Sequence, residues 1–213
     1  MNQRLLVPEL LDSMDPFDPQ AIRSRWDLRV INAFLGNERW ITSQCRRQAP
    51  TIDRIIELGA GEGHLSKRLH HALPQATITG LDFRARPDGL ASPIRWIQGD
   101  FLKTLEGTPS DTCVGNLILH HFDSGGLRTL GNILQKFRML VFCEPLRRII
   151  PMTLARLTLP LAGEVTRHDM PASIRAGFVC GELPSLLGLD PAHWNIEEKE
   201  SGRGSLRLIA SRK

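Results

Sequence analysis

The chain has 213 residues, of which 41% are hydrophobic and 23% are charged, and its formal net charge is +4. That length suits one domain with a buried core, and no apolar run approaches the roughly 20 residues that a membrane helix needs. The 27 Lys and Arg residues are spread along the whole chain rather than gathered in one basic run. We therefore expect no membrane span and no nucleic-acid partner.

The cysteines and the first residues of the chain indicate the compartment. Cys45, Cys113, Cys143 and Cys180 show none of the short paired spacings that mark a zinc knuckle, a redox dithiol or a disulfide framework. Residues 1–11 have neither the basic start nor the apolar core of a signal peptide. We expect an unprocessed protein of the reducing cytoplasm, present as a monomer or a homodimer.

Residues 1–50 are expected to form an amino-terminal helical extension. Within 19–47, apolar residues recur at helical spacing at Ile22, Trp26, Val30, Ile31 and Phe34. Such a stripe indicates an amphipathic helix. We expect this extension to act as a lid over a binding cleft.

From residue 51 onward, strands alternate with helices, which predicts an α/β fold with a doubly wound, mostly parallel seven-stranded sheet. Strands are expected at 52–58, 77–81, 94–98, 113–119, 139–143, 193–200 and 205–211, and the last two form an antiparallel hairpin. Helices are expected at 65–73, 126–137, 149–161 and 178–187, with no full helix between 81 and 94. The domain would span 51–213, with a lid insertion at about 146–177 and the ligand site at the carboxyl ends of the strands.

Three alternate glycines follow the first predicted strand, where residues 57–63 read Glu-Leu-Gly-Ala-Gly-Glu-Gly. Glycine permits positive φ and close approach of main-chain amides, and a helix N-terminus favours negative charge, so this bend indicates a nucleoside site rather than a plain turn. The dinucleotide fingerprint G-x-G-x-x-G would need glycine at His64, and no P-loop sequence occurs. The Glu57 carboxylate suits a ligand that carries an amino group and a sulfonium, which favours S-adenosylmethionine over NAD.

This segment resembles the first motif of class I S-adenosylmethionine-dependent methyltransferases, and three later segments resemble further motifs in order. Asp82 follows the second strand, where a carboxylate can accept hydrogen bonds from both ribose hydroxyls, although it could also be a helix cap. Residues 98–101 resemble the adenine-binding motif, and 111–122 the fourth-strand motif. The resemblance covers 52–145 and implies cofactor contacts from Glu57, Gly59, Ala60, Gly61, Gly63, Asp82, Phe83, Asp100, Phe101 and Asn116. Asp100 could also cap a short helix, a role that does not exclude adenine binding.

Catalytic and acceptor-binding residues are less clearly marked. His168 beside Asp169 is a candidate general base, and His120 is a second candidate, although each could be a structural or surface histidine. Residues 144–145 and 165–169 resemble a bacterial subgroup of quinone- and polyketide-type methyltransferases. Acceptor contacts are expected from His121, Glu144, Arg147 and Arg167, with a solvated charge cluster as the alternative for Glu144 and Arg147.

No metal is expected, because no Cys, Asp or Glu lies at a recognised ligand spacing from the pairs at 70–71 and 120–121. The function that this pattern indicates is methyl transfer from S-adenosylmethionine to a small, hydrophobic or aromatic acceptor of the phenol, quinol or polyketide kind. The alternatives are a catalytically idle S-adenosylmethionine-binding partner subunit, an RNA or protein methyltransferase, and an NAD-linked reductase.

Overall fold

The protein is an α/β domain built on one seven-stranded sheet, as predicted. The computed structural model describes residues 3–48 and 51–213, with the backbone alone at 154 and 156–159. The strands are β1 (Arg54–Leu58), β2 (Thr77–Asp82), β3 (Arg95–Gln98), β4 (Thr112–Asn116), β5 (Met139–Pro145), β6 (Trp194–Glu200) and β7 (Ser205–Arg212). Their order across the sheet is β3-β2-β1-β4-β5-β7-β6. The pairs among β1 to β5 are parallel, and β7 runs antiparallel to both β5 and β6, which confirms the hairpin.

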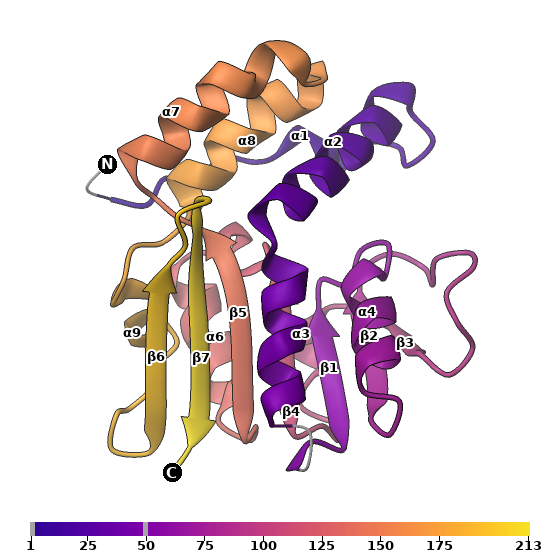
Figure 1. Ribbon diagram of the computed structural model, residues 1–213, viewed down its shortest axis with the longest axis vertical. Helices are drawn as coiled ribbons and strands as arrows, with labels where there is room; N and C mark the ends of the chain where they lie inside the picture. Colours follow the sequence, from indigo (N-terminus) through magenta and orange to yellow (C-terminus); the bar gives the residue numbers. More distant parts are fainter. Residues whose placement is uncertain (1–2, 49–50) are drawn as a thin grey trace.

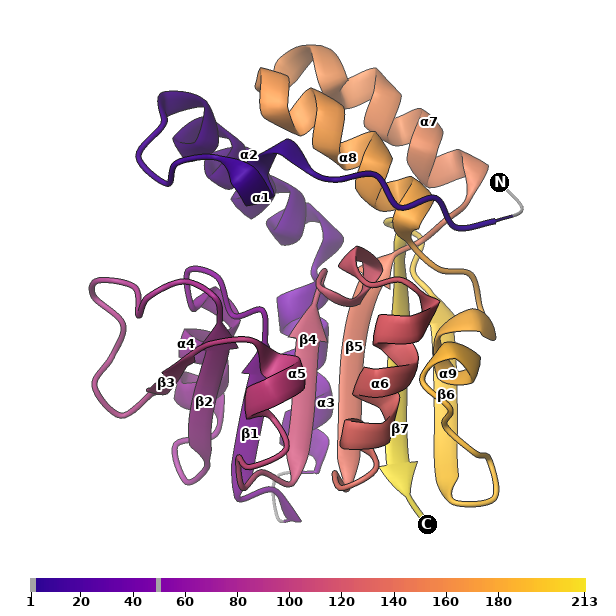
Figure 2. The same ribbon diagram turned by 180° about the vertical axis from the view of Figure 1, so that it is seen from behind.

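Helices cover both faces of the sheet and its carboxyl edge. They are α1 (Leu10–Ser13), α2 (Pro19–Leu35), α3 (Asn37–Arg47), α4 (His64–Ala72), α5 (Phe101–Thr104), η2 (Leu119–His121), α6 (Ser124–Leu134), α7 (Ile149–Thr158), η3 (Leu159–Leu161), α8 (Glu164–Ala176) and α9 (Glu182–Leu186). α3 and α4 lie on one face (Figure 1), and α5, α6 and α9 lie on the other (Figure 2). The two faces carry separate apolar clusters, and β5 is buried along its whole length, as expected of a strand covered on both sides.

Four helices, α1, α2, α7 and α8, lie over the carboxyl ends of the parallel strands, and we call them the helical cap (Figure 1). The predicted extension at 19–47 is divided at Gly36, whose φ of 68° ends α2. α2 then packs on α8 within the cap, whereas α3 packs on the sheet with Ile41 and Cys45 in its core. The segment therefore contributes both to the cap and to the sheet.

The apolar stripe of α2 does not face the core. Ile22, Trp26, Val30 and Phe34 are each about half exposed, whereas the buried residues of this helix are small or polar. Ser24 lies 3.1 Å from the Thr166 hydroxyl, and the Asp27 carboxylate accepts the Gly163 N–H at 2.7 Å. The spacing predicted the helix correctly, but α2 contacts α8 through these hydrogen bonds and a small apolar cluster of Ala21, Leu28 and Val165 rather than through the predicted stripe.

Several predicted elements have different limits in the structure. β4 ends at Asn116 rather than at 119, because Leu117 has a positive φ of 57° that no strand residue adopts. The helix expected at 178–187 is reduced to α9 at 182–186. The connection 83–93 contains no helix, as predicted.

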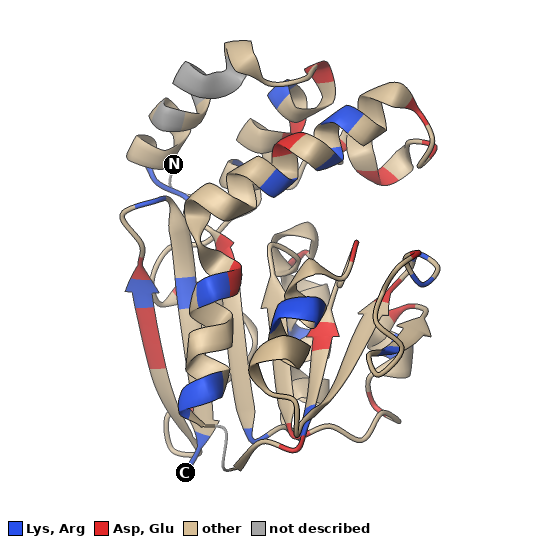
Figure 3. Cartoon of the chain, turned by 45° about the vertical axis from the view of Figure 1, so that its right-hand side comes forward, with Lys and Arg blue, Asp and Glu red and all other residues tan. Residues whose placement is uncertain are grey.

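Charge is distributed without one dominant basic face in the view of Figure 3, where Lys and Arg alternate with Asp and Glu over several elements. Among the helices in the described part of the chain, none combines the length and the apolar character that crossing a membrane requires.

Gly131 marks the closest approach of α6 to the segment that follows α9. A Cβ at this position would lie 2.0 Å from the Leu187 carbonyl oxygen. We expect Gly131→Ala to lower the free energy of unfolding by about 1–3 kcal/mol, because the backbone must move apart. Gly125→Ala is the matched control in the same helix, since its Cβ would make only an ordinary contact at 3.4 Å. Urea unfolding of both variants measures the difference, and equal stabilities would contradict this packing.

Candidate functional site

The glycine bend connects β1 to α4 at the carboxyl edge of the sheet. Gly59, Gly61 and Gly63 have φ values of 63°, 52° and 72°, a region that other residues enter only with strain. The bend is held by Asp82 at the end of the neighbouring strand β2, whose carboxylate accepts the Gly61 N–H at 2.8 Å. The sequence therefore folds into the compact bend that the glycines predicted, beside the predicted acidic residue.

Two of these glycines serve different purposes. A Cβ on Gly59 would lie 2.5 Å from the Ile118 side chain, so Gly59 permits close packing beneath the bend. A Cβ on Gly61 would meet no described atom within 4 Å. Gly61 therefore borders open space, which a side chain would partly fill and which a ligand can approach.

Asp82 keeps hydrogen-bonding capacity toward that space. Its two carboxylate oxygens accept N–H groups of Gly61 and Arg84, at 2.8 and 2.9 Å. An ionised carboxylate offers about four acceptor sites, so this half-buried group can still accept hydroxyl donors. The adjacent Phe83 is 66% exposed at the carboxyl end of β2 and presents an apolar surface beside it.

Asn116, the last residue of β4, points a polar group toward the helical cap. Its Nδ2 atom donates to Asn32 of α2 at 3.3 Å. Its Oδ1 atom is buried and has no hydrogen-bond partner within residues 3–48 and 51–213. A buried acceptor without a partner is costly, so this oxygen fits a ligand that brings an N–H or O–H donor.

Glu57 lies beneath the bend rather than beside the open space around Gly61. The side chain is buried against α4, where it accepts the Ser66 hydroxyl. Burial raises the pKa of Glu57 to about 8, although the hydrogen bond from Ser66 opposes the rise. The geometry therefore supports a structural role under the loop.

This shifted pKa predicts a pH-dependent stability. Between pH 4.5 and about 8, Glu57 carries a proton in the folded chain but has lost it in the unfolded chain, where its pKa is near 4.5. The contribution of the neutral Glu57 carboxyl to the free energy of unfolding is fully present below pH 4.5 and is lost as pH rises through about 8. We expect Glu57→Gln, which needs no proton, to gain stability relative to the unsubstituted chain by a few kcal/mol between these pH values. Urea unfolding at both pH limits measures this, and a difference that does not change with pH would contradict it.

The two residues predicted to bind adenine, Asp100 and Phe101, have different structural contacts. Asp100 caps α5, since its carboxylate accepts the Leu102 N–H at 2.9 Å, which is the alternative noted for it. Phe101 is 3% exposed, and its ring lies 5.1 Å from that of Phe122 within the core. This position supports a packing role for Phe101 and leaves contact with a base as a prediction. Ala60 is also buried, so at that position only the main chain is suited to a ligand.

His120 forms a buried pair with Glu144 at the carboxyl edge. Glu144 accepts the N–H groups of Ile118, Leu119 and His120, at 3.0, 2.8 and 3.2 Å, and lies 2.8 Å from His120 Nδ1. Burial alone would lower the pKa of His120, but the hydrogen bond to Glu144 and the negative charges of Glu144 and Glu9 outweigh it and raise the pKa to about 9. Glu144 thus fixes the turn after β4 and is fully occupied by its own chain.

His121 differs from its neighbour because it reaches solvent. Its ring lies 4.3 Å from that of His120, and its Nδ1 atom is 3.4 Å from the Asp12 carboxylate of α1. Sequence analysis did not identify Glu9 or Asp12, because the segment that precedes α2 shows no motif or periodicity. Only the fold brings this arm against η2.

The remaining predicted residues lie on or beside the cap. His168 is 44% exposed and its Nδ1 atom lies 2.8 Å from Asp169, so the predicted pair forms. Asp169 also accepts the N–H groups of Leu10 and Leu11, at 2.8 and 3.1 Å. Arg167 is exposed on the same helix.

Arg147 is buried at the far end of the cap. Its side chain donates to the Gly177 carbonyl at 3.1 Å and pairs with Glu182. These contacts join the end of β5 to α9. They favour a structural role over contact with an acceptor.

The fold and the site together define a class. A doubly wound sheet with a glycine bend after β1 and a carboxylate at the end of β2 is a Rossmann-like domain, a fold in which ligands bind at the carboxyl edge of the sheet. The terminal antiparallel strand β7, inserted between β5 and β6, is the arrangement of the Rossmann-like methyltransferase fold.

Comparisons with known proteins agree on this fold. No family model matches the chain. Uncharacterized methyltransferases of Mycobacterium bovis and Mycobacterium tuberculosis are 31% identical over 93 residues, an alignment that covers 38% of this chain and 47% of theirs. The chain thus matches about half the length of these curated relatives.

Solved structures match over more of the chain. The plantazolicin methyltransferase BpumL, crystallised with a monoazolic desmethylPZN analog and SAH, has a TM-score of 0.70 at 15% identity and covers 92% of this chain and 91% of its own. Human N-acetylserotonin methyltransferase in complex with SAM has a TM-score of 0.66 at 16% identity, over 97% of this chain and 60% of its own. The pyocyanin biosynthetic protein PhzM has a TM-score of 0.60 at 22% identity, over 92% of this chain and 60% of its own. The predicted resemblance to class I methyltransferases is therefore confirmed in the fold.

Proposed function

We propose that this chain transfers a methyl group from S-adenosylmethionine to a small organic acceptor. The observation that carries the proposal is the bend at Gly61, which borders open space and is held by the Asp82 carboxylate. The similarity to proteins named methyltransferases, two of them crystallised with SAM or SAH, supports the choice of cofactor.

Residues beside the bend fit such a cofactor in three respects. Asp82 would accept hydrogen bonds from the two ribose hydroxyls, because its carboxylate retains acceptor sites beyond those used by the Gly61 and Arg84 N–H groups. The unpaired Asn116 Oδ1 atom would accept a hydrogen bond from the amino group of the methionine part. Phe83 offers an apolar surface to the base. These three contacts would fix the cofactor at the ends of β2 and β4.

S-adenosylmethionine supplies a methyl group on a positively charged sulfonium, so the protein mainly has to align the acceptor and exclude water. The helical cap would provide that enclosure above the carboxyl edge. If the acceptor requires deprotonation, His168 with Asp169 has the geometry of a base. His120 fits this role less well, since a buried imidazole with a pKa of about 9 is already protonated at neutral pH.

For the acceptor we propose a hydrophobic or aromatic molecule of the phenol, quinol or polyketide kind. Support comes from the solved structures that this chain resembles, which include a plantazolicin methyltransferase with a desmethylPZN analog, an N-acetylserotonin methyltransferase and a pyocyanin biosynthetic protein. His121 and Arg167 are the exposed members of the predicted acceptor set. Contact with an acceptor stays a prediction for both.

The test is incubation of the purified chain with methyl-labelled S-adenosylmethionine and a panel of phenols, quinols and polyketides. We expect label in at least one of these products and none in RNA or protein. Transfer only to RNA or protein would contradict the proposed acceptor class. Cofactor binding without turnover on any acceptor, together with a stable partner in pull-downs, would instead support the idle subunit.

A further inference from the structure

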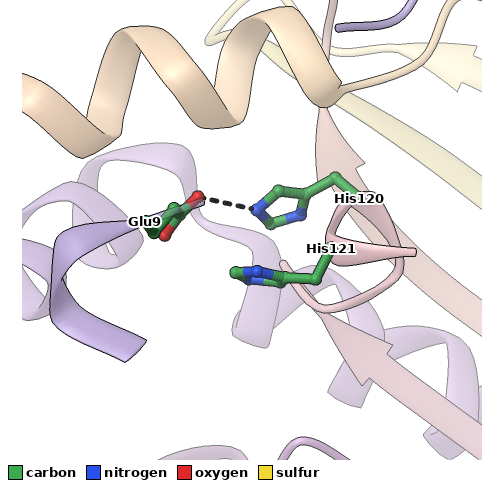
Figure 4. Close-up of side chains that lie close together, drawn as sticks. All are labelled: Glu9, His120 and His121. Atoms are coloured by element: carbon green, nitrogen blue, oxygen red, sulfur yellow. Dashed lines mark ion pairs between the residues drawn. The ribbon is translucent and has the colours of Figure 1, made fainter. Parts of the chain in front are cut away.

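A cluster of two histidines and one glutamate lies where the amino-terminal arm meets the turn after β4. Figure 4 shows Glu9, at the start of α1, pointing toward the His120 and His121 rings of η2. Each residue offers one ligand atom, and the three atoms all lie within 4.8 Å of one another. Two imidazoles and a carboxylate form a ligand set typical of zinc-type ions.

His120 is held in the orientation that a metal ligand needs. Glu144, which is fully buried, lies 2.8 Å from His120 Nδ1 and also accepts main-chain N–H groups, so the ring cannot rotate freely. An Nδ1–H donated to this carboxylate leaves Nε2 as the atom that faces Glu9. A histidine whose other nitrogen is held by a carboxylate is the usual supporting arrangement at metal sites.

The distance between the two facing ligand atoms fits coordination better than a direct hydrogen bond. His120 Nε2 and Glu9 Oε1 are 3.5 Å apart. Two ligands about 2.1 Å from a tetrahedral zinc ion are separated by about 3.4 Å. A strong hydrogen bond between a charged imidazole and a carboxylate would be shorter, at about 2.7–2.9 Å.

The other two ligands also have supporting partners. Glu9 accepts the Ser173 hydroxyl of α8, which orients its carboxylate, and only 14% of the Glu9 side chain is exposed. His121 has Asp12 near its Nδ1 atom, at 3.4 Å. The cluster thus joins three separate parts of the chain, namely the arm, η2 and α8.

We propose that Glu9, His120 and His121 bind a divalent transition-metal ion of the zinc type. Three protein ligands leave at least one position of a tetrahedral ion for water or another oxygen ligand. The inference does not depend on methyl transfer, since it concerns binding of the ion alone. The sequence predicted no metal because Glu9 lies far from the histidine pair along the chain.

The competing interpretation is an ion pair in which a protonated His120 bridges Glu9 and Glu144. Both interpretations follow from the same surroundings, because two carboxylates beside a buried imidazole favour a positive charge at Nε2. They differ in what they require of His121. A protonated bridge has no need of it, whereas a metal ion uses it as a ligand.

The test is titration of the purified chain with Co²⁺, followed by its visible absorption, and then displacement of Co²⁺ by Zn²⁺. All samples carry Cys180→Ser, because an exposed free cysteine is itself a ligand for these ions. The two test variants are Glu9→Gln and His121→Ala. The matched control is His193→Ala, which removes an exposed histidine 3.4 Å from the Asp190 carboxylate at the start of β6. Circular dichroism establishes that each variant is folded.

We expect one Co²⁺ per chain, displaced by Zn²⁺, with affinity at least tenfold lower in both test variants and unchanged in the control. A chain that binds no Co²⁺ at equimolar concentration would overturn the proposal in favour of the protonated bridge. So would a folded His121→Ala variant that keeps the full affinity, or a His193→Ala variant that loses it.

Discussion

Replacing Asp82 with alanine is expected to lower the affinity for S-adenosylhomocysteine about 100-fold. Each hydrogen bond to a charged group contributes about 1.5–3 kcal/mol, so loss of the two proposed ribose contacts costs at least about 3 kcal/mol. The variant also loses the acceptor of the Gly61 N–H, which holds the bend. Isothermal titration calorimetry measures the affinity directly.

Asp88→Ala is the matched control for this variant. Asp88 is exposed in the same connection between β2 and β3, and its loss changes the net charge by the same amount. We expect this control to bind as tightly as the unsubstituted chain. Equal affinities of the Asp82 and Asp88 variants would show that the carboxylate at the end of β2 does not hold the ligand.

The second large effect is expected at Gly61, where alanine should weaken cofactor binding at least tenfold. Its Cβ would extend into the space that the described residues leave open, where we propose that the cofactor approaches the main chain. The positive φ of 52° adds backbone strain, which costs about 1–2 kcal/mol of stability. Calorimetry and urea unfolding together separate these two contributions.

Gly89→Ala is the matched control for this variant, because it introduces similar backbone strain without placing a Cβ at the proposed cofactor site. Gly89 has a φ of 69°, and a Cβ there would likewise meet nothing within 4 Å, but it lies in the exposed connection after β2. We expect a similar loss of stability and an unchanged affinity for S-adenosylhomocysteine. If both variants lost affinity equally, strain rather than contact at the bend would be responsible.

Much of this architecture could be predicted because its signals are local. The apolar strand before Gly59 and the alternate glycines predicted the bend, and the spacing to Asp82 placed a carboxylate beside it. The short connection at 83–93 and the hairpin around 201–204 followed from chain length and turn residues. Each of these features depends on neighbours in sequence.

The rest depends on tertiary contacts that spacing does not encode. The turn at Leu117 ends β4 early because Glu144 of the next strand accepts hydrogen bonds from the N–H groups of Ile118 and Leu119. The same contacts bury His120, so one of the two histidines that were predicted to be catalytic is enclosed by its own chain. Glu9 approaches it because α8 and η2 anchor the amino-terminal arm, through Asp169 and through the main-chain carbonyls that Arg4 contacts.

The central claim is that the bend at 59–63 and Asp82 hold an adenosyl cofactor joined through sulfur. The most direct measurement is calorimetric titration of the unsubstituted chain with S-adenosylhomocysteine, with NADH in a parallel titration. We expect one S-adenosylhomocysteine to bind per chain and NADH to give no heat of binding. Binding of NADH alone, or of neither compound, would contradict it.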